Sequence, residues 1–486
     1  MAKHSRRRPR ASPGGDVYQS PLVARNASAE MAALFSPRRR VATWRRIWIA
    51  LAQTQRELGL PISAVQIRAL KAAVEKIDLA AAARHEARLR HDVMAHLHAF
   101  ADEAPAARGI LHLGATSMDI VDNADLILLR DALRIVQGWL VTVVEALARQ
   151  AERHRNLPCL GFTHFQPAQL TTIGKRISLW CWDFVRDLEE VDRLLAGLRF
   201  RGLRGATGTQ AGFFKLLGSA AKVRRMEQRV AAKLGFRDCE PVTGQTYSRK
   251  VDAQVIAALA NIAASVHKFG NDMRLLAHLK EVEEPFEAGQ VGSSAMAYKR
   301  NPMLCERATG LARFVISLAQ SGFQNAAEQW LERTLDDSAN KRLLVPECFL
   351  ATDGMLQIVA HVANGLVVYP RMIRSHIEAE LPFMATEDIL MAAVAAGGNR
   401  QGLHERIRVH SRAAGEQVKR YGKPNDLLGR LKRDPAFSGV RIERIMDPAG
   451  FTGLAAEQVD EFLSKTVGPL RRRHRGTPRR RPEISV

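Results

Sequence analysis

The stretch from Gly289 to Pro302, GQVGSSAMAYKRNP, concentrates side chains that can do chemistry. Ser293 opens a pair of serines, Lys299 follows it six residues later, and Asn301 comes shortly after. A serine hydroxyl is a poor base at its ordinary pKa, and it needs nearby cations or N–H groups to stabilise its oxyanion. An isolated Gly-Ser-Ser would indicate only a surface loop with a serine helix cap. Here the density of reactive types, which continues to Glu306, favours a catalytic loop.

A second candidate is His164, in the segment GFTHFQPAQ. It stands between Thr163 and Gln166 in a predicted loop just before a long helix. An imidazole, with an ordinary pKa of about 6.5, is the side chain best matched to proton transfer at neutral pH. The flanking hydroxyl and amide could hold one tautomer. A solvated loop histidine is the plainer alternative.

The third group is Arg90-His91-Asp92, in the segment RLRHDVMAHLH. His91 is followed by His96 and His98, which would suggest a metal site if the three met. Spacings of five and seven residues do not converge on one helical face, and the sequence holds no other ligand cluster. We therefore predict no metal.

The fourth group lies in ERTLDDSANKR and contains Arg333, Ser338 and Arg342. Ser338 and Arg342 are four residues apart, so on a helix they share a face. Arginine forks suit carboxylate or phosphate oxygens. A solvated charged face is the alternative that this group alone leaves open.

The elements that must position these residues are predicted to be helices. Apolar residues recur every three to four positions from Trp44 to Leu58, from Ile173 to Leu198 and from Val251 to Leu279. The last two segments would each span roughly 40 Å, much longer than an average helix, which indicates an extended bundle. Strict alternation is hard to find, so the predicted fold class is all-α. The irregular segments that carry the chemistry are 111–119, 157–172, 200–212, 283–302 and 333–342.

Changes of pattern near residues 116 and 368 divide the chain into predicted domains. These are a basic disordered arm (1–17), an N-terminal helical domain (18–116), a central long-helix bundle (117–368), a C-terminal helical domain (369–470) and a basic disordered tail (471–486).

The composition, 46% hydrophobic and 25% charged over 486 residues, is that of a globular protein and excludes a disordered one. No run of about 18 apolar residues predicts a membrane span, and no apolar stretch follows the basic start as in a secretory signal. The five cysteines are scattered, which argues against a disulfide framework and favours a reducing, cytoplasmic location.

The net charge of +22 is concentrated at the ends of the chain. Residues 1–10 carry +5 and residues 465–486 carry +7, which leaves +10 for the residues between them. This moderately basic body could favour an anionic substrate. The tails leave open weak, non-specific contact with nucleic acid, with solvated tails as the plainer alternative.

Together these motifs resemble those of a known family. GSSAMAYKRNP is similar to the signature loop GSSxMPxKxNP of the fumarase/aspartase superfamily. YQSPLVARNASAEM, RLRHDVMAH, LGATSMDIVDNADL, GFTHFQPAQLTTIGKR, TGTQAGF, TGQTYSRK and ERTLDDSANKR resemble the adenylosuccinate lyases within it. The resemblance runs from about residue 18 to residue 470.

The resemblance implies a homotetramer whose central helices form a twenty-helix core, with each active site built from three subunits. It implies small-molecule nucleotide substrates and no metal or organic cofactor. The implied reactions release fumarate from adenylosuccinate, giving AMP, and from the succinylated aminoimidazole carboxamide ribotide (SAICAR), giving the free carboxamide ribotide (AICAR).

Carried over position by position, the family's roles fall on the residues found above. Ser293 resembles the general base, and His164 resembles the general acid, with Glu306 oriented toward it. His91 would act where the family positions the nucleotide and leaving group. The implied carboxylate, succinyl and other substrate contacts are Lys299, Asn301, Thr116, Ser117, Thr163, Arg90, Asp92, Gln245 and Arg307, and the implied phosphate-side ligands are Arg25, Arg333, Ser338 and Arg342.

The chain departs from the family pattern at two positions. Ala297 replaces the proline of the signature loop, which puts the stiffness of the loop in question. Asn26 stands where the mammalian-type enzyme has tyrosine, which puts one phosphate-side hydroxyl in question. Neither departure removes a proton-transfer group.

The alternatives at this stage are three. Another fumarate-releasing lyase, such as an argininosuccinate lyase, an aspartase or a fumarase, could share the loop. A catalytically silent scaffold is the second, although intact His164, Ser293 and Lys299 argue against it. The third is nucleic-acid binding through the arginine-rich tails.

Overall fold

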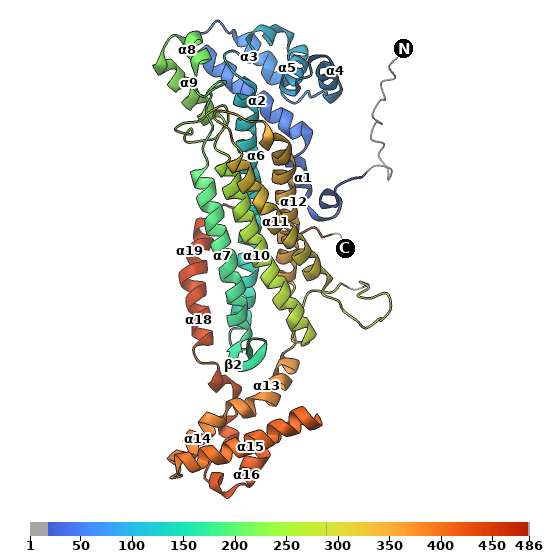
Figure 1. Cartoon of the computed structure of the whole chain (residues 1–486), viewed down its shortest axis with the longest axis vertical. Coiled ribbons are helices and arrows are strands. Elements are labelled where there is room, and N and C mark those ends of the chain that lie inside the picture. The colour runs from blue at the N-terminus through green and yellow to red at the C-terminus, as the bar shows by residue number, and fades with distance from the viewer. Residues whose placement is uncertain (1–17, 288, 485–486) are drawn as a thin grey trace.

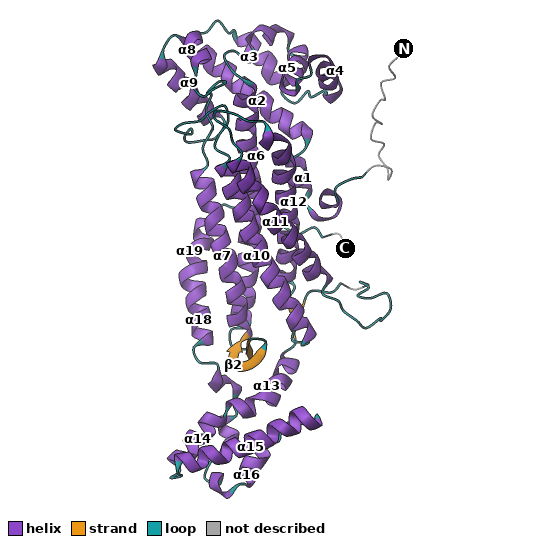
Figure 2. Cartoon of the chain, viewed as in Figure 1, coloured by secondary structure: helices purple, strands orange, loops and turns teal. Residues whose placement is uncertain are grey.

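The computed structural model describes residues 18–287 and 289–484, and this part of the chain is helical along most of its length (Figures 1 and 2). The chain forms one elongated molecule, with a bundle of long helices between two smaller groups of helices. The helices are α1 (Ala29–Leu34), α2 (Pro37–Glu57), α3 (Ala64–Ala73), α4 (Leu79–Leu89), α5 (Asp92–Glu103), α6 (Ser117–Arg153), α7 (Ile173–Gly197), α8 (Ala211–Leu217), α9 (Ala220–Lys233), α10 (Lys250–His278), α11 (Met303–Ala327), α12 (Asp336–Asn364), α13 (Pro370–Met384), α14 (Thr386–Ala395), α15 (Arg400–Tyr421), α16 (Leu427–Arg433), α17 (Ile442–Ile445), α18 (Ala455–Phe462) and α19 (Gly468–Arg473). The strands are β1 (Pro158–Thr163), β2 (Gln166–Thr172), β3 (Val282–Glu283) and β4 (Val367–Val368), and η1 (Leu22–Asn26) is a short π-helical turn.

The central bundle consists of α6, α7, α10, α11 and α12, packed side by side (Figure 1). α6 has 37 residues and is therefore about 55 Å long, and its inward face is apolar from Ile120 to Ala151. The predicted long helices at 173–198 and 251–279 are confirmed as α7 and α10 to within one or two residues. The all-α prediction is also confirmed.

The two ends of the bundle carry different groups of helices. At the upper end of Figure 1, α2 to α5 lie with α8 and α9, and at the lower end α13 to α17 enclose a separate small core. The predicted C-terminal domain included α18 and α19. α18, α19 and the π-helical turn between them (Leu463–Val467) return along the bundle, and the buried Val459, Val467 and Leu470 belong to its core.

The segment 157–172, predicted to be irregular, is an antiparallel β-hairpin of β1 and β2. Thr163 pairs with Gln166, so His164 and Phe165 form a two-residue turn, with φ of 53° and 57°. Positive φ at both turn positions is the geometry that hairpins favour, although Asn-Gly usually supplies it. The expectation of an irregular loop was wrong because the tip of the hairpin, residues 163–169, is exposed and the strands show no apolar alternation.

The C-terminal tail, predicted to be disordered from residue 471, is ordered as far as residue 484. α19 ends at Arg473, and the following residues lie against α6 through specific hydrogen bonds. The prediction failed because charge density alone does not reveal acidic partners that are distant in sequence. The predicted basic arm at 1–17 lies outside the described residues.

α12 is the one described helix that is long and apolar enough to cross a membrane by length and composition. However, 83% of its most apolar window is buried inside the fold. Such burial is typical of a core helix, and α12 occupies that place in the bundle.

Candidate active site

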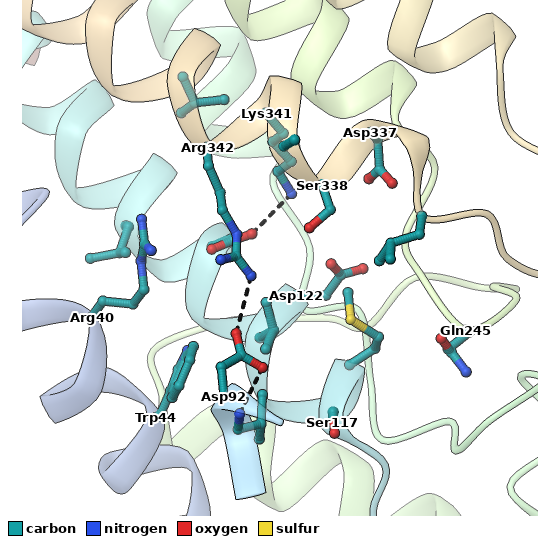
Figure 3. A pocket seen from close by; sticks show the side chains of 18 of the residues that line it. Arg40, Trp44, Asp92, Ser117, Asp122, Gln245, Asp337, Ser338, Lys341 and Arg342 are labelled. Carbon is teal, nitrogen blue, oxygen red and sulfur yellow. Dashed lines mark hydrogen bonds and ion pairs between the residues drawn. The ribbon is translucent and has the colours of Figure 1, made fainter. Parts of the chain in front are cut away.

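A cavity of about 890 Å³ opens at the upper end of the bundle, where α5, α6 and α12 begin (Figure 3). It collects nine of the predicted site residues from four distant parts of the sequence. They are Arg90, His91, Asp92, Thr116, Ser117, Gln245, Arg333, Ser338 and Arg342.

Local helix boundaries place His91 at the rim of this cavity. α4 ends at Arg90, whose left-handed backbone (φ 55°) turns the chain, and His91 then caps the N-terminus of α5. Its Nδ1 accepts a hydrogen bond from the backbone N–H of Met94 at 3.4 Å, and its Nε2 lies 3.4 Å from Ser117 Oγ. Ser117 is the first residue of α6, capped by the reciprocal bonds of Thr116 and Asp119.

Three helices, α5, α6 and α12, begin at this cavity. Helix N-termini carry partial positive charge and favour anionic groups. Two arginines reinforce this field. Arg342 Nη2 lies 3.1 Å from Asp92 Oδ2, and Arg333 Nη1 lies 2.7 Å from Asp337 Oδ1 (Figure 3 shows the first pair). The cavity therefore suits a ligand that carries phosphate or carboxylate groups.

Beneath the arginines lies a buried ion-pair network that was not predicted from the sequence. Arg249 pairs with both oxygens of Asp122 at 3.0 and 3.2 Å, and its Nε donates to Asp337 at 2.6 Å. Burial would lower the pKa of Arg249, but Asp122 and the other carboxylates around it raise this pKa well above its ordinary value. Burial would likewise raise the pKa of Asp337, yet Arg249 and Arg333 outweigh it and lower this pKa.

A second buried group continues the network below the cavity. Lys341 Nζ lies 2.5 Å from Tyr247 Oη and 3.0 Å from Asp125 Oδ2, and Tyr247 donates to Asp252 at 2.7 Å. Burial raises the pKa of Asp252. A signal for the network was present in the sequence, because α6 carries aspartates at three-residue spacing, which places them on one helical face.

Gln245 is held at the cavity by the backbone. Its N–H donates to Glu332 O at 2.9 Å, and its Nε2 donates to Ala206 O at 3.0 Å. Gln245 thereby joins the segment 200–212 to the segment before α12.

The remaining predicted site residues lie elsewhere in the chain. Thr163 and His164 are at the hairpin after the C-terminal end of α6, whereas the cavity adjoins its N-terminal end, so about 55 Å of helix separates the two. Figure 1 shows the hairpin at the lower end of the bundle. Both side chains are exposed.

Ser293 lies in a loop that leaves the bundle between β3 and α11 (Figure 1). Its Oγ accepts hydrogen bonds from the N–H groups of Ala295 and Met296, at 3.3 and 3.2 Å. Asn301 Nδ2 donates to Gly292 O at 2.8 Å and closes the base of the loop. A Cβ at Gly292 would lie 2.2 Å from Lys299 O, so only glycine permits this approach.

The rest of this loop is open to solvent. Lys299 and Ala297 are exposed. Glu306 lies in the first turn of α11, and its Oε1 is 3.9 Å from Arg274 Nη2. We expected Glu306 to be oriented toward His164, but within one chain its ion-pair partner is Arg274. Arg307 follows it on the same helix.

Arg25 and Asn26 form a third separate group, on η1 beside the middle of α12. Asn26 O accepts a hydrogen bond from Gln357 Nε2 at 3.1 Å, and the Asn26 backbone contacts Gly354. Neither residue lines the cavity. Within the described residues, no group of three or more His, Cys, Asp or Glu side chains could hold a metal ion.

Comparisons with known proteins define the class. Residues 63–317 match the sequence family described as "Lyase", and residues 382–462 match that described as "Adenylosuccinate lyase C-terminus". The fold resembles a crystal structure of fumarate lyase from Mesorhizobium sp. BNC1, with a TM-score of 0.77, 24% identity, and coverage of 92% of this chain and 99% of that one. Fold and motifs thus define a helical lyase of the fumarase/aspartase superfamily.

Two characterised relatives narrow the assignment. The adenylosuccinate lyase of Schizosaccharomyces pombe is 50% identical over 93% of this chain and 95% of its own. That of Saccharomyces cerevisiae is 50% identical over 94% and 96%. The chain belongs to the adenylosuccinate lyase family.

Proposed function

We propose that this protein is a carbon–nitrogen lyase that releases fumarate from adenylosuccinate, giving AMP, and from SAICAR, giving AICAR. The observation that carries the proposal is the 50% identity to two adenylosuccinate lyases over almost the whole chain. The cavity supports it, because helix N-termini and arginine forks suit a substrate with one phosphate and two carboxylates.

In the proposed mechanism Ser293 is the general base. It takes the proton from the succinyl carbon that lies β to the departing nitrogen. This proton is weakly acidic, because its removal places a second negative charge next to a carboxylate. Cations and hydrogen-bond donors aimed at that carboxylate are then the dominant catalytic contribution. Lys299, Asn301, Thr116 and Ser117 would supply them.

His164 is the proposed general acid, with Glu306 oriented toward it from another copy of the chain. The product nitrogen is a poor leaving group as an anion, so it needs a proton as the bond breaks. The hairpin turn presents His164 at an exposed tip, on backbone with positive φ. Backbone of this kind is costly, especially at the bulky Phe165, and it clusters at functional sites.

The cavity residues are proposed to bind the nucleotide. His91, with Arg90 and Asp92, would position the base and the leaving group. Arg333, Ser338 and Arg342 would hold the substrate phosphate. Arg25, which lies in a different segment of the chain, would bind the same phosphate. Thr163, Gln245 and Arg307 complete the proposed contacts, and Asn26 would take the place of the tyrosine of mammalian-type enzymes.

A homotetramer with shared sites is the proposed assembly. The four groups of site residues, at the cavity, the hairpin, the loop before α11 and η1, lie apart within one chain, so further copies must bring them together. The central helices also expose large apolar side chains, among them Trp182 on α7 and Phe314 and Phe323 on α11, which a partner would cover. A cytoplasmic location fits the five free cysteines.

The test is to incubate the purified chain with adenylosuccinate and follow the formation of fumarate. Argininosuccinate, aspartate and malate serve as parallel substrates, because each would reveal another lyase of the superfamily. Fumarate from adenylosuccinate and SAICAR alone supports the proposal. Release from one of the other substrates, or from none, would refute it.

A further inference from the structure

The chain after α19, residues 474–484, is here called the C-terminal strap. It lies against α6 and α7 and is held there by polar side chains, with Ile484 packed against the core near its end. His474 is only 4% exposed, and its Nε2 lies 2.9 Å from Asp192 Oδ2 on α7. The fork of Arg479 contacts both oxygens of Glu145 at 2.6 and 3.1 Å. The strap therefore has a defined path.

Arg480 connects the strap to α1. Its backbone N–H donates to Thr142 Oγ1 at 3.0 Å, and its guanidinium reaches Glu30 on α1 at 2.6 Å. The same guanidinium lies 5.8 Å from the centre of the Trp139 ring. Gly138 makes room for this crossing, because a Cβ there would lie 2.7 Å from Arg480 Nε and 3.1 Å from Pro478 O.

The far end of the strap reaches the same N-terminal segment by a second route. The N–H of Glu483 donates to Gln357 Oε1 at 3.3 Å, and Gln357 Nε2 donates to Asn26 O at 3.1 Å. Asp353, one turn earlier on α12, accepts the N–H of Ser28 at 2.5 Å. Residues 22–34 are thus held between α12 and the strap.

We propose that the C-terminal strap is a positioning element for substrate binding, which clamps η1 and α1 so that Arg25 is presented in a fixed conformation. The proposal rests on the proposed function, in which Arg25 is a phosphate ligand. If a segment is already ordered before the substrate binds, no binding free energy is lost in ordering it. Without the clamp, only part of the population is competent to bind, and the apparent affinity falls by that fraction.

The first experiment uses the full chain with Arg480→Ala and Arg480→Lys. We expect Arg480→Ala to raise KM for adenylosuccinate about five- to thirtyfold, as a loss of one to two kcal/mol implies, with kcat within about twofold. Arg480→Lys keeps one contact to Glu30 and should give an intermediate KM. Glu30→Gln should resemble Arg480→Ala, and the double variant should add little, since both break one contact.

A second variant acts from the opposite side of the contact. Gly138→Ala should displace the strap and raise KM even though alanine favours helix. The matched control is Gly415→Ala in α15, where a Cβ meets nothing within 4 Å, and it should leave KM unchanged. If Gly138→Ala behaves like this control and Arg480→Ala leaves KM unchanged, the proposal is overturned.

Two further readouts separate this proposal from the proposed function. In an Arg25→Ala background, Arg480→Ala should raise KM by less than twofold, because its effect passes through Arg25. Amide hydrogen exchange in residues 22–34 should also accelerate in Arg480→Ala, and this holds even if the chain fails to cleave adenylosuccinate. Unchanged exchange there would overturn the clamp, whereas absent lyase activity alone would overturn only the proposed function.

Discussion

The two ends of the bundle differ in how they hold the charged and reactive residues around the candidate site. At the upper cavity, Arg249, Asp122 and Asp337 are buried and paired within one chain. At the hairpin and in the loop before α11, His164 and Lys299 are exposed. The upper cavity is formed within one chain, whereas the hairpin and the loop display their reactive side chains on the surface.

This difference has an energetic meaning. Burying charges is costly, and a buried pair is retained mainly where position matters. The network beneath the cavity joins the starts of α6 and α12 within one chain, through the pairs of Arg249 with Asp122 and Asp337. Exposed residues on a hairpin and a loop cost the monomer little. We propose that they become part of a site when another copy of the chain covers them.

The largest expected effect is on activity at the exposed groups. Ser293→Ala and His164→Ala each remove a proton-transfer group and should lower kcat/KM by on the order of 10²–10⁴. Because both side chains are at the surface of the monomer, the free energy of unfolding should change by no more than about 0.5 kcal/mol. Steady-state kinetics and denaturant unfolding measure the two quantities. Near-full activity of Ser293→Ala would show that the base is misassigned.

At the cavity, we expect the larger effect on the free energy of unfolding. Asp337→Asn leaves Arg249 buried with less compensation and should lower the free energy of unfolding by about 3–5 kcal/mol. The neighbouring Asp336→Asn, at an exposed position, is the control and should cost less than about 1 kcal/mol. A comparable loss of unfolding free energy in both variants would show that the buried network does not stabilise this end of the bundle.

The same variant makes a prediction about pH. The pKa of Asp337 is lowered in the folded protein, so its contribution to stability is fully present above its ordinary pKa of about 3.9. It is lost as the pH falls through the lower folded value. The stability gap between wild type and Asp337→Asn should therefore be constant from pH 7 to 5 and close below pH 4. Unfolding curves at these pH values would test it.

The smallest effect concerns Ala297, in the exposed loop. A proline narrows the range of open conformations of a loop, which is worth about 0.4–1 kcal/mol where its backbone is compatible. Ala297→Pro should thus raise kcat/KM by no more than about fivefold, since 1.4 kcal/mol corresponds to about tenfold. A gain above tenfold would show that closure of this loop dominates the rate.

Sequence patterns were sufficient to predict the elements that interactions between neighbouring residues determine. Apolar periodicity predicted α7 and α10. The sequence also singled out His91 and Arg342 as candidate site residues, and both line the cavity. The hairpin was missed because its exposed strands lack alternation. The aspartate spacing in α6 indicates one side of the network around Arg249, but not its distant partners. The contact of Arg480 with Glu30 likewise joins residues far apart in sequence, and no local pattern identifies such partners.

The most direct test of the shared site is complementation between inactive variants. His164→Ala and Ser293→Ala proteins are mixed, subunit exchange is verified by mass spectrometry, and adenylosuccinate cleavage is measured. If the two residues reach one site from different chains, random mixing should restore about a quarter of wild-type activity. Verified exchange with activity no higher than that of the separate variants would contradict the account.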